Sequence, residues 1–361
     1  MLKFAIIGCG RISRWHVEAV VFNGTEAELV AVCDINREKA QEKAYLYAQA
    51  IGRLPLVYTD YRTMLEEVYV DVVTIATESG YHASIATECM KKGRHVLVEK
   101  PMALSSKDAD NMIRTSRNMG VKLGVCHQNR FNPSIIRLRR ALEAGCFGRL
   151  INGTASIRWN RGDEYYSKAS WRGTWSMDGG TLMNQCIHDI DLLQWMLGGQ
   201  IETVYAQTGT FLRNIEGEDF GAVIIRFKNK AIGIVEGSAC VYPSNLCECL
   251  SIFGEDGTAV IGGLAVNKVE TWMFKDNTKA GYAEKTVDTP ITSVYGKGHQ
   301  LLFKDMIDAI SNNREPLING EEGRKALDIV LAAYKSSLTG GTVRLPYGEF
   351  STMDMLSEGE L

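Results

Sequence analysis

A glycine-rich turn near the N-terminus constrains the fold of this chain more than any other feature. The segment Gly8-Cys9-Gly10-Arg11-Ile12-Ser13 follows an apolar run and opens a helical stretch. Gly8 permits a tight turn, and Gly10 lets the backbone approach a pyrophosphate group at the N-terminus of the helix. Ser13 stands where the pattern usually has glycine or alanine. A strand, a turn and a helix in this order predict a dinucleotide-binding βαβ unit.

The end of the next apolar run indicates which dinucleotide binds. Asp34 lies there, where an acid can accept a hydrogen bond from a ribose 2′-hydroxyl and would repel a 2′-phosphate. We therefore expect NAD as the cofactor. Arg37 leaves NADP as the weaker alternative, and turn glycines beside a helix-capping Asp34 are the purely structural alternative.

The first 126 residues alternate between strand and helix periodicities. This alternation implies βαβ units and a parallel sheet, and nearly continuous apolar runs are typical of strands covered on both faces. The expected strands are Lys3–Gly8, Glu28–Asp34, Val70–Ala76, His95–Glu99 and Val121–Cys126, and the expected helices are Ile12–Phe22, Arg37–Ile51, Tyr81–Lys92 and Ser106–Met119.

After about residue 128 the pattern changes to alternating strands with few helices between them. An antiparallel or mixed sheet is expected here. Its strands are expected near residues 151–159 and at Glu202–Thr210, Ala222–Phe227, Ile232–Cys240, Glu248–Phe253 and Val269–Phe274, with helices at Leu182–Leu197 and Glu321–Leu338. A chain of 361 residues without a flexible linker predicts two domains packed against each other, with a cleft at their junction.

Composition excludes several classes of protein. Hydrophobic residues make up 45% and charged residues 23%, which argues against disorder, and a net charge of −3 offers no basic surface for nucleic acid or membrane lipid. No apolar run approaches the length of a bilayer span. Nine scattered cysteines fit buried thiols in the reducing cytoplasm. We interpret Cys247 and Cys249 as alternate residues of a strand, and we expect no metal site.

Two groups of polar residues are candidates for the chemistry. Lys100 follows the expected strand His95–Glu99, and open α/β sheets bind ligands at the carboxyl ends of their strands. Asn184, His188 and Asp191 are spaced i, i+4, i+7 on an otherwise apolar helix, so they share one face. Buried polar groups need polar partners, so this stripe of three polar residues predicts a binding or catalytic site. A core histidine satisfied by Asp191 is the structural alternative.

Together these features resemble the Gfo/Idh/MocA oxidoreductase family, and the match covers nearly the whole chain. The segments that carry it are Gly8–Ser13, Ala76-Thr77-Glu78-Ser79 with His82, Glu99-Lys100-Pro101, Gln128-Asn129-Arg130-Phe131, the Asn184/His188 helix and residues 315–343. The resemblance implies a Rossmann domain over residues 1–127, a substrate-binding and oligomerisation α/β domain with an open, largely antiparallel sheet over 128–345, and a tail over 346–361. It also implies that helix 321–338 packs back on the first domain, that the Lys100–Pro101 peptide is often cis, and that the protein forms homodimers or homotetramers.

The resemblance also assigns residues. It implies that Thr77, Glu99, Lys100 and Gln128 contact NAD. The other expected NAD contacts come from the glycine-rich turn and from the end of the next strand and the start of its helix, and they are Gly8, Gly10, Arg11, Ile12, Asp34 and Arg37. The residues from Tyr165 to Trp195 are similar to the dehydrogenases that oxidise UDP-N-acetylglucosaminuronate at C3 in bacterial surface-polysaccharide synthesis. Many family members have aspartate four residues before the histidine, whereas this chain has Asn184, so acid–base roles of the inositol dehydrogenases do not transfer whole.

The expected activity is NAD-dependent oxidation of a sugar CH–OH group. His188 is the candidate base, since histidine titrates near neutrality, Lys100 is the second candidate, and Asn184 orients the sugar or the imidazole. Arginine binds diphosphate and aromatic rings stack on uracil, so Arg158, Tyr166, Trp171 and Arg172 are candidate substrate contacts, with Arg172 or Lys168 for a uronate carboxylate. The same stretch could instead be a subunit contact.

Other functions remain open from the sequence alone. The substrate could be a free sugar, an inositol, a glycoside or a dihydrodiol. A non-catalytic NAD(P) sensor or corepressor could share the fold, although Lys100 and His188 are both retained here. A redox-neutral enzyme that keeps its NAD tightly bound is a third alternative.

Overall fold

The computed structural model describes residues 1–198, 200–276 and 297–356, and the chain divides into two compact units. The first contains Met1–Gln128 and Lys297–Arg324, and the second contains Asn129–Gly296 and Lys325–Leu361. Residues 297–324 thus group with the glycine-rich turn, although the expected domain boundaries place them in the second domain. The return of helix 321–338 onto the first domain stays a prediction.

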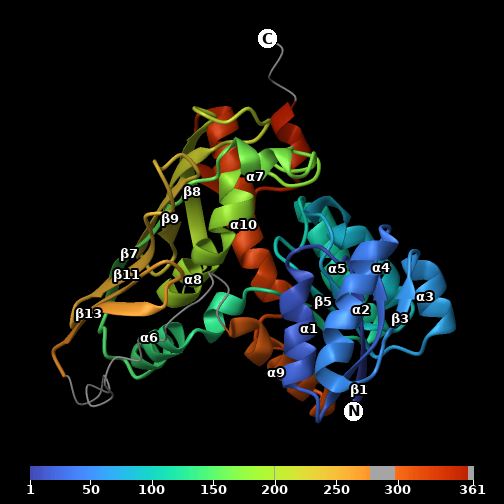
Figure 1. The fold of residues 1–361 in the computed structure, drawn as a ribbon. Coiled ribbons are helices and arrows are strands. Elements are labelled where there is room, and N and C mark those ends of the chain that lie inside the picture. The colour runs from blue at the N-terminus through green and yellow to red at the C-terminus, as the bar shows by residue number, and fades with distance from the viewer. Residues whose placement is uncertain (199, 277–296, 357–361) are drawn as a thin grey trace. The chain divides into compact units, whose positions relative to one another are not determined.

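The first unit is built on a six-stranded parallel sheet with the order β3-β2-β1-β4-β5-β6 (Figure 1). The strands are β1 (Leu2–Ile7), β2 (Ala27–Cys33), β3 (Leu56–Tyr58), β4 (Val72–Ile75), β5 (His95–Val98) and β6 (Leu123–Val125). The helices are α1 (Ser13–Phe22), α2 (Arg37–Ile51), α3 (Tyr61–Glu67), η1 (Ser79–Tyr81), α4 (His82–Lys91), α5 (Ser106–Met119) and α9 (Gly298–Ser311). The chain leaves β1 toward β2 and later crosses to β4 on its other side, which makes the β1/β4 junction the switch point of the sheet.

Local sequence explains these elements. Except for the edge strand β3, the strands are almost fully buried because helices cover both faces, as their apolar runs predict. Asn36 caps α2 by accepting hydrogen bonds from two backbone N–H groups, and Ser105 accepts the Asp108 N–H at the start of α5. The short β3 and α3 were missed because neither element has a long enough period to be read from the sequence.

The second unit contains an eight-stranded sheet with the order β13-β12-β11-β7-β10-β9-β8-β14, and among these described strands only β7 and β10 pair in parallel. Its strands are β7 (Leu150–Arg158), β8 (Ile201–Gly209), β9 (Phe220–Phe227), β10 (Ile232–Ser238), β11 (Cys247–Gly254), β12 (Gly257–Gly262), β13 (Lys268–Phe274) and β14 (Val343–Arg344). Its helices are α6 (Pro133–Glu143), α7 (Asp163–Ser167), the π-helical turn η3 (Leu182–Cys186), α8 (Ile187–Leu197) and η4 (Thr352–Leu356). The turn η2 (Gln128–Phe131) and helix α10 (Gly320–Thr339) each cross a boundary between the units in sequence. Together the two sheets confirm the predicted α/β fold class.

Alternation along β7 places α8 on one face of this sheet. Gly153 lies beside Leu193 of α8, where a Cβ atom would come within 2.9 Å of the leucine Cδ1. From Gly153 onward, residues of this parity on β7 are buried, whereas those of the other parity are half-exposed. One face of the sheet therefore holds the core of the unit and the opposite face is open.

Two expectations about composition can be compared with the structure. Cys247 and Cys249 are alternate residues of β11, as predicted, and all nine cysteines are free thiols. Within the described ranges, we find no helix with the length and hydropathy needed to cross a lipid bilayer.

Candidate functional site

The glycine-rich turn has the geometry that a dinucleotide pyrophosphate requires. Gly8 has φ +91°, and a Cβ atom there would lie 2.5 Å from the Ala76 carbonyl carbon, so only glycine fits between β1 and β4. A Cβ atom at Gly10 would meet only open space, which leaves the backbone accessible to a ligand. Ser13 donates to the Gly10 carbonyl at 2.7 Å and closes the turn. No side chain caps the N-terminus of α1, so an anion can bind its N–H groups.

Asp34 lies directly after β2 and ties the loop ends together. Its Oδ2 accepts the Cys9 N–H at 2.7 Å, and its Oδ1 accepts the Asn36 N–H at 2.8 Å. The carboxylate is half-exposed next to the glycine-rich turn, where its remaining lone pairs can accept a ribose hydroxyl. Arg37, predicted as a contact for a 2′-phosphate, is exposed at the start of α2. The residues present therefore fit NAD.

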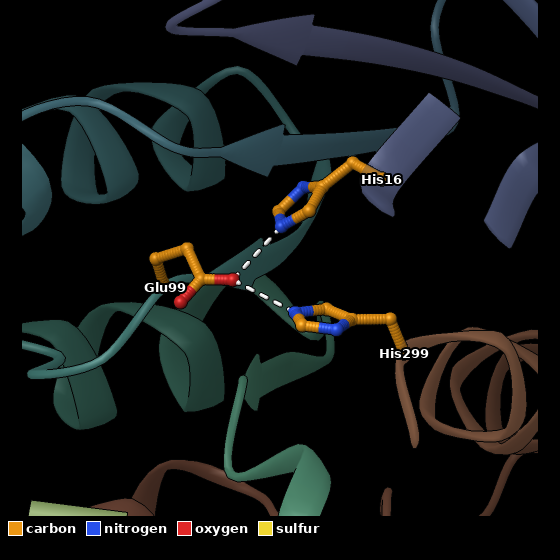
Figure 2. A group of neighbouring side chains, drawn as sticks. All are labelled: His16, Glu99 and His299. Atoms are coloured by element: carbon orange, nitrogen blue, oxygen red, sulfur yellow. Dashed lines mark hydrogen bonds and ion pairs between the residues drawn. The ribbon is translucent and has the colours of Figure 1, made fainter. Parts of the chain in front are cut away.

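Glu99 forms a buried cluster with two histidines that no sequence pattern connects to it (Figure 2). Its Oε1 lies 2.9 Å from His16 Nε2 and 3.2 Å from His299 Nε2, and all three side chains are at least 94% buried. The two histidines hold the pKa of Glu99 well below its ordinary value against the opposing effect of burial, whereas burial lowers the pKa of His16. The carboxylate expected to contact the cofactor therefore faces the interior of this unit.

Lys100 and its neighbours lie at the carboxyl end of β5. The Lys100 N–H donates to Glu99 Oε2 at 3.3 Å, and the Lys100–Pro101 peptide is cis. His82 bridges the ends of two strands, since its Nδ1 lies 2.8 Å from the Pro101 carbonyl and its Nε2 lies 3.1 Å from the Thr77 carbonyl. Thr77 and Lys100 thus lie together at the switch-point end of the sheet, whereas Gln128 is buried at the start of η2.

The predicted polar stripe in the second unit divides into two parts. Asn184 and His188 are half-exposed within an otherwise buried run, with Asn184 on the π-helical turn η3 and His188 in the first turn of α8. Asp191 instead points into the core and pairs with Arg130, with Nε–Oδ2 and Nη2–Oδ1 distances of 2.7 and 2.6 Å. Asp191 is thus the partner of a buried arginine, and its pairing with a core histidine stays an alternative. A π-helical turn has one more residue per hydrogen-bonded ring than an α-helix and is frequent at functional sites.

Asn184 belongs to a hydrogen-bonded chain of side chains. Its Nδ2 donates to Asp178 Oδ1, and its Oδ1 accepts from Gln185 Nε2 at 3.0 Å. The same Gln185 nitrogen lies 3.1 Å from the Tyr165 hydroxyl, and Gln185 Oε1 accepts from Arg161 Nε at 3.1 Å. Asn184 is thereby held in one orientation and linked to the segment that was predicted to bind substrate.

That segment forms what we term the arginine–tyrosine surface, made of Arg161, Tyr165, Tyr166 and Arg172. The guanidinium carbon of Arg172 lies 4.2 Å from the centroid of the Tyr165 ring, and that of Arg161 lies 5.4 Å from it. Tyr165 and Tyr166 meet edge to face at 5.1 Å between ring centroids. Trp171 lies beside this surface, with the Arg172 guanidinium 5.6 Å from its ring. Guanidinium groups stacked on rings keep hydrogen-bond donors for a diphosphate or carboxylate.

Arg158 lies elsewhere. It has the parity of the open sheet face, opposite to the face on which α8 packs, and it forms a two-fold ion pair with Glu236 at 3.0 and 2.7 Å. Lys168 pairs with Glu164 at 2.7 Å on the exposed surface. The structure thus brings Tyr166 and Arg172 to the side of Asn184 but does not bring Arg158 there.

Residues that no sequence pattern indicated support the π-helical turn. The Tyr334 hydroxyl accepts the N–H groups of Gly180 and Met183 at 3.1 and 3.2 Å and donates to Glu218 Oε1 at 3.1 Å. Glu218 Oε1 also accepts the Leu182 N–H at 2.6 Å, and burial raises the pKa of this carboxyl to about 8. These bonds satisfy backbone N–H groups at the start of η3. Glu218 and Tyr334 are isolated polar residues far apart in sequence, so no periodicity could have paired them.

A pair of buried carboxyls joins α8 to β11, with Asp189 on the helix and Glu248 on the strand. Asp189 and Glu248 are 0% and 2% exposed. Burial raises the pKa of Asp189 to about 7 and that of Glu248 well above its ordinary value, and the nearby Asp189 raises the pKa of Glu248 further. Asn129 Nδ2 donates to Glu248 at 3.3 Å. These two carboxyls hold a proton near neutral pH, and Asp189 directly follows His188 in the sequence.

Comparison with known proteins agrees with this geometry. Residues 2–127 match the oxidoreductase family with an NAD-binding Rossmann fold, and residues 135–260 match the GFO/IDH/MocA C-terminal domain. The WlbA dehydrogenase from Bordetella pertussis, solved with NADH and UDP-GlcNAcA, is 37% identical with a TM-score of 0.84 over 96% of this chain and 99% of that one.

Two further relatives define the range of similarity. The WlbA dehydrogenase from Chromobacterium violaceum, also solved with NADH and UDP-GlcNAcA, is 35% identical with a TM-score of 0.84 over 96% of each chain. Myo-inositol 2-dehydrogenase of Thermotoga maritima is 25% identical over 349 residues, which cover 95% of this chain and 98% of that protein.

Proposed function

Because this chain belongs to the Gfo/Idh/MocA family of NAD-binding oxidoreductases, we propose that it oxidises a ring hydroxyl of a UDP-N-acetylhexosaminuronate, at C3. The observation that carries the proposal is the neutral Asn184, anchored by Asp178 and linked through Gln185 to the arginine–tyrosine surface. A uronate with a diphosphate is strongly anionic. An amide beside guanidinium groups suits such a substrate better than the aspartate of many relatives, because a carboxylate would repel it.

The first unit supplies the cofactor site. Gly8, Gly10, Arg11 and Ile12 would hold the pyrophosphate at the N-terminus of α1, and Asp34 would accept the ribose hydroxyl. Thr77, Lys100 and Gln128 are proposed to contact the nicotinamide half of NAD. Glu99 is proposed to hold them in place from the interior of the unit. When bound, NAD provides the hydride acceptor.

The protein side chains manage the proton and the substrate. His188 is proposed to accept the hydroxyl proton, and Lys100 to stabilise the negative charge that develops on the reacting oxygen. Asn184 would hold the sugar by neutral hydrogen bonds. Tyr166, Trp171 and Arg172 would bind the nucleotide diphosphate or the uronate carboxylate, and Arg161 joins them on geometric grounds. Arg158 lies on the open face of the second sheet and is proposed not to bind the substrate.

An assembly and a cellular context complete the proposal. The open face of the second sheet exposes Ile224, Ile234 and Tyr205, and we propose that a second copy of the chain covers it in a homodimer or homotetramer. Nine free thiols fit the cytoplasm, where nucleotide sugars for surface polysaccharides would be oxidised.

Inositol oxidation is the second candidate, because the Thermotoga relative is a myo-inositol 2-dehydrogenase. Initial rates of NADH formation with the UDP-uronate, with UDP-N-acetylglucosamine and with myo-inositol separate the candidates. We expect kcat/KM for the UDP-uronate to exceed the other two by at least about 100-fold, since a charged hydrogen bond contributes up to about 3 kcal/mol. Higher kcat/KM with myo-inositol would overturn the substrate proposal. A single burst equal to the enzyme concentration would instead indicate trapped NADH and a redox-neutral cycle.

A further inference from the structure

The buried cluster of His16, Glu99 and His299 joins three segments of the first unit (Figure 2). His16 lies on α1, the helix that follows the glycine-rich turn, Glu99 follows β5, and His299 lies in the first turn of α9. Both imidazoles reach one oxygen of the carboxylate, and the other oxygen accepts the Lys100 N–H. A single carboxylate thus connects the cofactor helix to the backbone of the candidate catalytic lysine.

The hydrogen bonds to the Glu99 carboxylate define the tautomers of His16 and His299. An ionised carboxylate only accepts hydrogen bonds, so the Nε2 atoms of both His16 and His299 carry hydrogens. Thr74 Oγ1 lies 3.1 Å from His16 Nδ1 and can donate to it, which is consistent with a neutral His16. A buried carboxylate with three N–H donors is well satisfied, and loss of one donor leaves an undercompensated charge in the interior.

We propose that His16 and His299 are positioning residues that act through Glu99 to fix the backbone of Lys100 for the reaction. The proposal deepens the proposed function and rests on the catalytic role given there to Lys100. A lysine side chain is long and flexible, so the placement of its ammonium depends on a fixed starting point in the backbone. A displacement of about 1 Å at a reacting group lowers the rate by about 100-fold.

The same donor set could hold a metal ion, because two imidazoles and one carboxylate lie within 4.8 Å of one another. Hydrogen bonds account for the cluster without an ion, since the two N–O distances of 2.9 and 3.2 Å are ordinary for N–H donors. A metal ion bound by the cluster is therefore the alternative that the experiment must be able to detect.

A double-mutant cycle tests the proposal. His299→Leu removes the donor and is expected to lower kcat about 10- to 100-fold, with the Kd for NAD changed less than about 3-fold. His299→Gln places an amide N–H near the former Nε2 and should recover most of kcat. In a Lys100→Ala background, His299→Leu should have almost no further effect, because the residue through which it acts is already gone. His16→Gln serves as a second variant, and thermal unfolding confirms that each variant is folded.

Several outcomes would overturn the proposal. Equal losses from His299→Leu in both backgrounds would show that the cluster does not act through Lys100. Stoichiometric bound metal by elemental analysis of the purified protein, absent from His299→Leu, would establish a metal site instead. Nitrogen-15 NMR that finds a hydrogen on Nδ1 alone of either histidine would contradict the hydrogen-bond assignment. The NMR and metal measurements need no substrate, and the cycle can use whichever substrate turns over, so failure of the UDP-uronate assignment remains distinguishable.

Discussion

Arg130 and Asp191 form a fully buried, two-fold hydrogen-bonded ion pair within the second unit. Their side chains are 1% and 0% exposed, and the Arg130 guanidinium also lies 4.7 Å from the ring of Trp195. The pair connects η2 to α8, the helix that carries His188. It therefore holds the site helix in place from the core side.

Removal of one partner of this pair should strongly destabilise the second unit. Asp191→Ala leaves a buried, uncompensated guanidinium, and we expect the free energy of unfolding to fall by about 3–5 kcal/mol in urea denaturation. Glu236→Ala is the matched control, since Arg158 and Glu236 pair with the same geometry but are 43% and 37% exposed. That variant should lose less than about 1 kcal/mol. Similar losses in both variants would contradict this assignment.

Stability should decrease as the pH rises from 7 to 8. Burial raises the pKa of Glu218 to about 8, so the folded state keeps a proton that the unfolded state has lost, and the free energy of unfolding falls by about 1 kcal/mol between pH 7 and 8. The carboxyls of Asp189 and Glu248 act in the same direction. Buried histidines with lowered pKa values oppose this trend only below about pH 6.5. Urea denaturation of Glu218→Gln should show a slope shallower by about 1 kcal/mol per pH unit, and an unchanged slope would rule the assignment out.

Asp34 should determine cofactor preference. Asp34→Ala removes the acceptor for the ribose and the repulsion of a 2′-phosphate, so the Kd for NAD should rise about 10-fold while that for NADP stays equal or falls. Calorimetry measures both. Glu38→Ala, an exposed acid in the first turn of α2, is the control and should leave both values unchanged. Equal losses for NAD and NADP would mean that Asp34 only holds the loop.

The uncharged side chain of Asn184 should favour an anionic substrate. Asn184→Asp places a second carboxyl against Asp178, which is 2% exposed and already accepts the Gly173 N–H at 2.8 Å. We expect kcat/KM for the UDP-uronate to fall about 100-fold in this variant, because two facing carboxylates disrupt the site and repel the substrate. Asn184→Ala separates loss of the amide from gain of charge and should lose less. Undiminished turnover in Asn184→Asp would contradict the electrostatic argument.

Local pattern predicted much of the fold. The glycine-rich turn, Asp34 and five of the six strands of the parallel sheet are specified by short-range order, and Ser105 caps the helix that follows it. β3, α9 and the grouping of residues 297–324 with the first unit depend on tertiary packing, which periodicity does not encode. The expected helix over 182–197 divides into η3 and α8, since Tyr334 and Glu218 hold the first turn from elsewhere in the chain.

The site was predictable only where its residues share one element. Asn184 and His188 were found because they lie four positions apart on one face. Asp191 was assigned to the same stripe, yet its partner Arg130 comes from η2 and no spacing pointed to it. His16 and His299 were missed for the same reason, since 283 positions separate them and Glu99 lies between.

Hydride transfer from C3 of the UDP-uronate with His188 as the base is the central claim, and an isotope measurement tests it most directly. UDP-N-acetylglucosaminuronate deuterated at C3 is incubated with NAD and either the wild-type protein or His188→Ala, and mass spectrometry follows the reduced cofactor and the sugar. We predict deuterium in the reduced nicotinamide, a 3-keto sugar product, and a rate at least about 100-fold lower in His188→Ala with NAD affinity retained. Deuterium that stays on the sugar, or full activity in His188→Ala, would contradict the account.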